Sequence, residues 1–295
     1  MLADLSVDSQ GRYAVASPFE IGEIIIYDAS GRFVRTVGRR GGGPGEFEAI
    51  TRLRFGPGDS LHVVQENGRY SLFSPSLDHV RSVTFPARVF SFALGSSGQI
   101  VASSPAAGGG GQYAVQVFSQ AGDRLHAFDE VAGSSGSAMR RYVAVGPDGG
   151  IWTLQLDRYE IRSYDNQGML RATYRGRRSW ISEEPLPQRL DLTTTPPPGQ
   201  MAGITVDAAG RVWVFAAVAD ANWRPIQPQG GPPAVSTIYD TLVEVFDPRS
   251  GAIVGHARMD HMVFPLGAGR AHGSLPQPDG DERIHIWNVT LPENR

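Results

Sequence analysis

Lysine and cysteine are both missing from this sequence of 295 residues. Without lysine, the chain has no residue for a Schiff base, a lysine general base or a Walker-type phosphate loop. Without cysteine, it has no disulfide, no thiolate nucleophile and no cysteine-ligated zinc. No apolar run approaches the roughly 18 residues of a membrane-spanning helix, and residues 1–5 lack the basic and apolar regions of a signal peptide. These absences exclude several classes of enzyme and a membrane span.

An excess of basic charge is missing as well. The 27 basic residues, all of them arginine, are matched by 30 acidic residues, which gives a net charge of −3. This balance provides no overall attraction for nucleic acid or for an anionic membrane surface. We therefore expect no nucleic-acid partner.

What the sequence does contain is a repeat of paired short strands at intervals of 40 to 50 residues. The first hairpin of each unit joins two apolar strands through a glycine turn, and the second opens its turn with Asp or Ser. Four of these turn-opening residues, Asp28, Ser74, Ser119 and Asp165, are spaced 46, 45 and 46 residues apart. Four antiparallel strands at this period indicate a β-propeller blade, because a lone four-stranded sheet must stack against neighbours to bury its faces.

The repeats predict an all-β fold, a six-bladed β-propeller of four-stranded antiparallel blades in one domain over residues 1–295. The last blade lacks an encoded outer strand, because the chain ends six residues after its third strand, predicted at 283–289. Either upstream residues that would close the propeller are absent from this chain, or a partner fills the open edge. The predicted blades cover residues 1–45, 46–88, 89–133, 134–196, 197–261 and 262–295.

Three patterns carry a resemblance to a known family. They are the strand-Asp-x-x-Gly-x-strand units at 7–13 and 206–212, the Tyr-Asp or Phe-Asp second hairpins, and the segment GRRGGGPGEF at 38–47. Together they resemble NHL-like six-bladed β-propellers of bacteria over nearly the whole chain. The resemblance implies the fold and a periplasmic or other extracytoplasmic location. It implies no single activity, since members include scaffolds, RNA binders and enzymes.

The glycine-rich segment 38–47 raises the question of a phosphate site. A phosphate loop needs Gly-Lys-Ser or Gly-Lys-Thr at the start of a helix. This segment has no lysine and runs into residues 50–55, whose pattern is typical of a strand. We predict a connection between blades, in which glycine supplies backbone conformations with positive φ.

Long connections are predicted on one face of the propeller, because turns a–b and c–d leave one face and connections b–c and d–a leave the other. They cover residues 38–47, 106–112, 176–200 and 219–240. The last two are rich in proline, exceed 20 residues and place tryptophan beside arginine. Trp and Arg are enriched at binding hot spots, so we expect a partner-contact surface; the alternative is that the aromatics pin the loops to the propeller. The candidate contacts are Arg177, Arg178, Trp180, Trp223 and Arg224.

A second set of arginines lies near the starts of inner strands and could surround the axial mouth, where it would suit an anionic ligand or an acidic partner. The alternative is that they are scattered surface arginines. The set comprises Arg39, Arg40, Arg52, Arg140 and Arg141.

We assign no catalytic, cofactor-binding or metal-ligating residue, because the seven histidines fall at inequivalent strand positions and no Gly-x-Ser-x-Gly motif occurs. The expected function is a non-catalytic protein-binding or scaffold module without a cofactor. It would be an accessory subunit that docks a larger complex, including a membrane-bound one, through the long-loop face. The alternatives are a lactonase- or lyase-like enzyme, or a small-ligand or carbohydrate binder, that uses the axial pocket.

Overall fold

In a computed structural model of the protein, the regular elements of the described residues are β-strands apart from one short 3-10 helix, Pro57–Asp59. No helix among the residues placed in this structure has the length and apolar character needed to cross a bilayer. The structure describes residues 4–16, 22–108, 111–131, 136–181, 186, 191–226, 238–267, 269–277 and 282–290.

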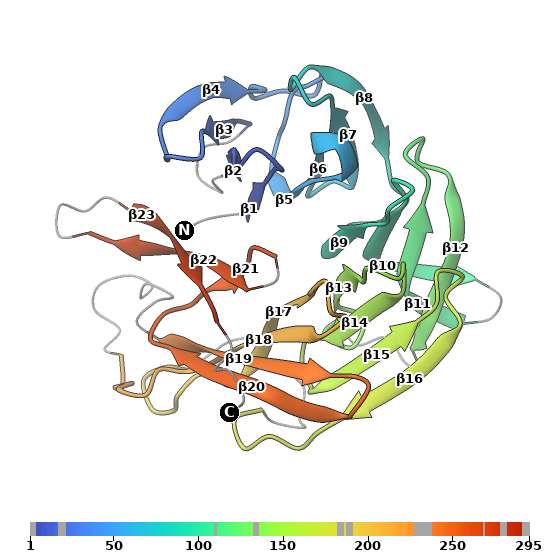
Figure 1. The fold of residues 1–295 in the computed structure, drawn as a ribbon. Coiled ribbons are helices and arrows are strands. Elements are labelled where there is room, and N and C mark those ends of the chain that lie inside the picture. The colour runs from blue at the N-terminus through green and yellow to red at the C-terminus, as the bar shows by residue number, and fades with distance from the viewer. Residues whose placement is uncertain are drawn as a thin grey trace. The chain divides into compact units, whose positions relative to one another are not determined.

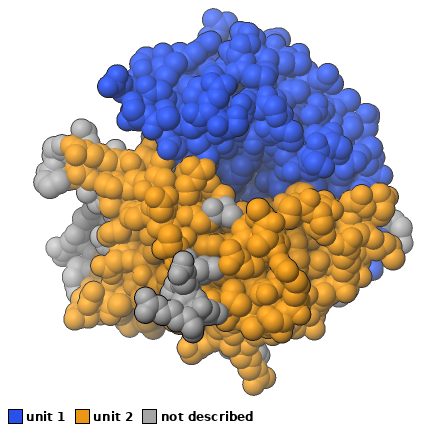
Figure 2. All heavy atoms as spheres, viewed as in Figure 1, with its two compact units in different colours: residues 1–133 blue, residues 134–295 orange. Residues whose placement is uncertain are grey.

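Residues 1–133 form one compact unit (Figure 2). It holds three sheets, each of four antiparallel strands that pair in chain order (Figure 1). The first sheet is β1 (Asp4–Val7), β2 (Tyr13–Ala16), β3 (Ile24–Tyr27) and β4 (Phe33–Val37). The second is β5 (Ile50–Phe55), β6 (Leu61–Gln65), β7 (Arg69–Phe73) and β8 (His79–Thr84). The third is β9 (Ser91–Leu94), β10 (Ile100–Gly108), β11 (Gly111–Phe118) and β12 (Arg124–Val131).

Residues 134–295 form a second compact unit, also built from three antiparallel sheets. Its first sheet is β13 (Arg141–Val145), β14 (Ile151–Gln155), β15 (Glu160–Tyr164) and β16 (Leu170–Arg175). The next is β17 (Gln200–Val206), β18 (Val212–Ala219), β19 (Tyr239–Asp247) and β20 (Ala252–Met259). Over the described residues, the last sheet has three strands, β21 (Phe264–Pro265), β22 (Arg270–Pro276) and β23 (Glu282–Asn288).

These six sheets confirm the predicted six-bladed β-propeller fold, including the three-stranded last blade. One predicted connection is wrong. The glycine run at 106–112 was expected as a long loop, but β10 and β11 continue into it, with Ala106 opposite Tyr113 and Gly108 opposite Gly111. Small residues do not prevent an antiparallel ladder when the backbone groups of both strands remain available to pair.

The repeated Asp or Ser has a direct structural role at the turns. Asp207 Oδ1 accepts hydrogen bonds from the backbone N–H groups of Ala209 and Arg211, at 2.9 and 2.8 Å. The same oxygen pattern, with bonds to residues two and four positions later, recurs at other turns and explains why Asp or Ser opens them. It is present at Asp8, Asp28, Ser119 and Asp165.

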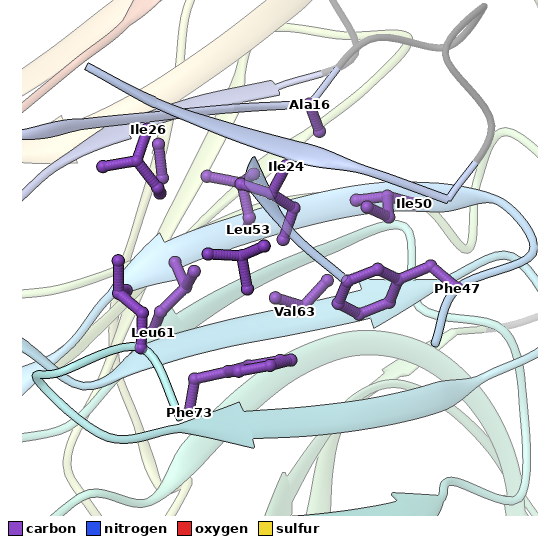
Figure 3. Close-up of a cluster of buried hydrophobic side chains, with 12 residues drawn as sticks. Ala16, Ile24, Ile26, Phe47, Ile50, Leu53, Leu61, Val63 and Phe73 are labelled. Atoms are coloured by element: carbon purple, nitrogen blue, oxygen red, sulfur yellow. The ribbon is translucent and has the colours of Figure 1, made fainter. Parts of the chain in front are cut away.

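The glycine-rich segment 38–47 folds around a buried aromatic ring. Phe47 is fully buried in a hydrophobic cluster beside Leu53 and Val63 (Figure 3), and its ring centroid lies 5.8 Å from that of Phe73. Gly38 has φ +81°, and a Cβ there would collide with the Phe47 ring. No helix follows, since the chain enters β5, so the prediction of a connection between blades is confirmed for this segment.

Buried His62 should make the unit of residues 1–133 less stable in acid. Its Nδ1 lies 2.7 Å from the Tyr70 hydroxyl and its Nε2 lies 3.0 Å from Ser60 Oγ. Burial lowers the pKa of His62 from 6.5 to about 4. The unfolded chain therefore takes up this proton at higher pH than the folded protein does. The free energy of unfolding must then fall as the pH drops from 6.5 to about 4. We expect a loss of about 1.4 kcal/mol per pH unit.

The measurement is denaturant unfolding against pH, followed by circular dichroism, because all five tryptophans lie in residues 134–295 and would report only that unit. His62→Gln should be less stable than the wild type near neutral pH but should lose less stability on acidification to pH 4.5. Equal slopes for both proteins would contradict the assignment.

Candidate functional site

The two longest connections meet at the same end of the β17–β20 sheet, where one enters the sheet and the other leaves it. Gln200 at the start of β17 pairs with Ala217 near the end of β18, and Ala219 pairs with Tyr239 at the start of β19. Connection 176–199 therefore arrives where connection 220–238 departs. We call this the loop end of the sheet.

A backbone hydrogen bond joins the two connections. The N–H of Ile226 donates to the carbonyl of Leu192 at 2.8 Å. Both side chains are half-buried against the same hydrophobic cluster, which includes Phe215 and Val243. Segments that lie 34 positions apart in sequence thus form one continuous surface at the loop end.

Asp240 holds the base of connection 220–238. This residue is fully buried on β19, and its Oδ2 accepts hydrogen bonds from the N–H of Ala221 at 3.1 Å and from Arg258 Nε at 2.7 Å. Arg258 also donates to the carbonyl of Ala219 at 2.9 Å. One carboxylate and one guanidinium therefore fix the point where the chain leaves β18.

A second cluster holds the first residues of connection 176–199. Arg178 lies over the Tyr159 ring, 4.2 Å from its centroid, and its Nη2 is 3.1 Å from Glu244 Oε2 on β19. The Tyr159 hydroxyl donates to the same oxygen at 2.6 Å. Trp180 packs edge-on against Tyr159, with centroids 6.3 Å apart. A Cβ at Gly199 would collide with the backbone carbonyl of Trp180, so only glycine fits there.

The charges of this cluster are matched. Hydrogen bonding to Glu244 and the charge of its carboxylate raise the pKa of Arg178 despite partial burial. Burial, together with the hydrogen bond to Glu244, raises the pKa of Tyr159. Arg178 therefore stays a cation and Tyr159 a neutral hydroxyl donor across the physiological range.

An arginine-rich cleft of about 740 Å³ opens beside the cluster. Its lining combines the turn between β14 and β15 with the end of β16 and the residues that follow. Tyr159 and Ile181 supply apolar surface. The charged residues of the lining are Arg158, Glu160, Arg175, Arg177 and Arg178.

The predicted partner contacts divide into anchors and exposed groups. Trp180 and Trp223 are half-buried, and Arg178 is committed to Glu244, as expected if these residues fix the loops. Arg177 and Arg224 are exposed. Arg224 donates only to carbonyls of its own loop, at Asn222 and Trp223, among the hydrogen bonds of the described residues.

The predicted axial arginines fall in both units. Arg39 is exposed and ion-paired with Glu46 at 2.7 Å, and Arg40 is exposed. Arg52 donates to the Thr51 carbonyl at 2.7 Å, with its guanidinium 5.7 Å from the Phe90 ring centroid. In the second unit, Arg140 is exposed, whereas Arg141 is buried and donates to the Ala138 carbonyl at 2.6 Å. A common role at an axial mouth stays a prediction.

Several residues of the site have no signature in the sequence. Tyr159 and Glu244 meet across 85 positions, and no local pattern links them. Over the residues that the structure describes, no three His, Asp or Glu side chains lie close enough together to hold a metal ion.

Solved structures match the fold over nearly the whole chain. A catalytically inactive virginiamycin B lyase from Staphylococcus aureus, determined with quinupristin, has a TM-score of 0.53 at 10% identity and covers 92% of this chain and 90% of its own. A protein of unknown function from Bacteroides caccae has a TM-score of 0.52 at 10% identity, with coverages of 90% and 82%. A streptogramin B lyase has a TM-score of 0.50 at 12% identity, with coverages of 99% and 84%.

At such low identity these similarities show a shared β-propeller fold and carry no activity to this chain. No protein-family model matches the sequence, and no curated protein matches it. The propeller part of the predicted resemblance is confirmed, while the narrower NHL-like assignment stays a prediction.

The Arg178–Glu244 pair should stabilise the unit of residues 134–295. Its side chains are 25% and 16% exposed, so removing one partner leaves a poorly solvated charge. We expect Arg178→Met and Glu244→Gln each to lower the free energy of unfolding by about 1–2 kcal/mol. Denaturant unfolding followed by tryptophan fluorescence measures this, because Trp180 packs beside the pair.

The double variant Arg178→Met/Glu244→Gln provides the control. Because each substitution removes the same interaction, the double variant should lose less stability than the sum of the single losses. Strictly additive losses would show that the pair contributes nothing as a pair.

Proposed function

We propose that the protein is a non-catalytic binding module that docks a protein partner through the loop end of residues 134–295. The observation that carries the proposal is the hydrogen bond between Ile226 and Leu192, which joins the described parts of two long connections. Loops longer than about 12–15 residues without their own secondary structure are uncommon in compact domains, and those that occur are often functional.

Anchoring prepares this surface for binding. Trp180 and Arg178 fix one connection to the sheets below, and Asp240 fixes the base of the other. A surface that is already held in place loses less conformational entropy when a partner docks. The exposed guanidinium groups of Arg177 and Arg224 lie on these anchored segments, where arginine is a frequent source of binding energy.

The connections at the opposite end of the same sheets are much shorter. They are tight turns, and a side-chain oxygen closes those from Asp165 to Met169 and from Asp207 to Arg211. Their Asp side chains are used to hold the turn. The contrast between the two ends supports docking at the loop end.

The wider role in the proposal is that of an accessory subunit of a larger complex that works outside the cytoplasm, including a complex in a membrane. Support for this role comes from the resemblance of the repeats to NHL-like propellers. Conversion of quinupristin by the purified protein would contradict the non-catalytic part of the proposal, since a virginiamycin B lyase shares the fold.

Site-specific photocrosslinking tests the docking surface. A photoreactive amino acid is placed at Arg177 or Arg224, and the protein is exposed to an extract of the organism that encodes it. The matched control carries the same group at Gln167, which is exposed in the tight turn at the opposite end of the β13–β16 sheet.

We expect a discrete crosslinked protein from positions 177 and 224 but not from position 167. Identical products from all three positions, or none from the loop positions while position 167 crosslinks, would contradict docking at the loop end.

A further inference from the structure

The arginine-rich cleft has a chemistry more specific than a general contact surface. Four arginines and one glutamate supply the charged part of its lining, in a protein whose net charge is −3. The strands place these arginines side by side. Arg175 ends β16 directly opposite Glu160, the first residue of β15, and Arg158 lies in the turn just before that strand.

A carboxylate already occupies one position in this group. Glu160 Oε2 lies 2.6 Å from Arg175 Nε, and its Oε1 lies 2.6 Å from Arg162 Nη2. Burial alone would raise the pKa of Glu160, but the hydrogen bonds and charges of the two arginines outweigh burial and lower it. Glu160 is therefore an ionised carboxylate that is paired with two guanidinium groups, so this end of the β13–β16 sheet can bind carboxylates.

Donor groups remain on the solvent side of the cleft. The side chains of Arg158 and Arg175 are 53% and 67% exposed. Arg175 uses its Nε for Glu160, and Arg158 Nε is 3.8 Å from Asp157, beyond hydrogen-bond distance. Since each guanidinium has five N–H donors in a flat fork, further carboxylates can bind without displacing the existing pairs.

We propose that the cleft binds an extended polypeptide segment bearing several Asp or Glu side chains. This inference rests on the proposed docking function and names the chemistry of the partner where connection 176–199 leaves the β13–β16 sheet. Arg175 and Arg178 are already bonded to Glu160 and Glu244, so a compact anion cannot draw all four guanidinium groups together. A polypeptide with carboxylates spaced along it can bind these arginines without moving them together.

The test is fluorescence anisotropy of a labelled peptide of alternating Glu and Gly, titrated with the full chain. We expect saturable binding that weakens with added salt, because the contacts are ionic and exposed. Arg158→Ser and Arg175→Ser should each weaken binding by about tenfold or more. Arg171→Ser is the matched control, because Arg171 also lies on β16, is 51% exposed and pairs with Asp148, but it lies outside the cleft lining. The affinity of the Arg171→Ser variant for the peptide should stay within a factor of about two of that of the wild type.

Further ligands test whether binding needs carboxylates and whether those carboxylates must belong to a polypeptide. The same peptide with Gln in place of Glu should not bind, and equal binding of both peptides would overturn the inference. Citrate or inorganic phosphate that binds the cleft as tightly as the Glu peptide would overturn the assignment to a polypeptide and indicate a small anion instead. Tryptophan fluorescence of each variant, which reports residues 134–295, verifies that it is folded.

Failure of this inference differs from failure of the proposed function. If the Glu peptide does not bind while positions 177 and 224 still crosslink one protein, the loop end docks a partner of other chemistry. If the Glu peptide binds and neither position crosslinks, the cleft binds carboxylates but the proposed docking surface is wrong.

Discussion

One hydrogen-bonding arrangement closes turns in four of the six sheets that the structure describes: a side-chain oxygen at the start of a turn accepts the backbone N–H groups two and four residues later. Asp8, Asp28, Asp165 and Asp207 make these bonds as carboxylates, and Ser119 makes them as a hydroxyl. The arrangement closes the turn within a few residues. It therefore keeps one end of each such sheet short, and additional chain length has to be accommodated at the other end.

The loop end shows how long connections are held where no such turn is possible. Here long-range contacts replace local ones. Glu244 on β19 accepts hydrogen bonds from Arg178 of connection 176–199 and from Tyr159 of the β14–β15 turn, and Asp240 accepts them from Arg258 and from the backbone of Ala221. These carboxylates are partly or fully buried, so their partners are needed to offset the cost of desolvation. The result is a surface supported from below, with arginines directed outward at Arg177 and Arg224.

The fold was largely predictable from the sequence, because the features that define it are local. The spacing of Asp28, Ser74, Ser119 and Asp165 reflects one turn per sheet, and apolar alternation marks the strands on either side. The hairpin of β10 and β11 was predicted too short, since alanine and glycine give no periodic signal although their backbones pair. The prediction therefore failed where the side chains carry no periodic pattern and backbone hydrogen bonds alone form the strand pairing.

The candidate site was predictable only in part. Unusual loop length and the pairing of tryptophan with arginine pointed to Arg177, Trp180, Trp223 and Arg224. The sequence did not predict that Tyr159 and Glu244 anchor the first loop, because that contact depends on how one sheet packs against the next. The cleft likewise depends on the register that sets Glu160 opposite Arg175, and a shift of one residue would turn these side chains to opposite faces.

Because the protein has no native cysteine, a disulfide can test directly whether the two distant connections form a single surface. Leu192→Cys combined with Ile226→Cys places two thiols at positions joined by a 2.8 Å backbone hydrogen bond. Backbones paired in this way have Cα atoms roughly 4.5–6 Å apart, within the range of a disulfide. We predict that the folded protein forms this disulfide under mild oxidation, whereas Leu192→Cys with Gln167→Cys stays reduced. If the first pair stays reduced in the folded protein, or both pairs oxidise alike, the single surface does not exist.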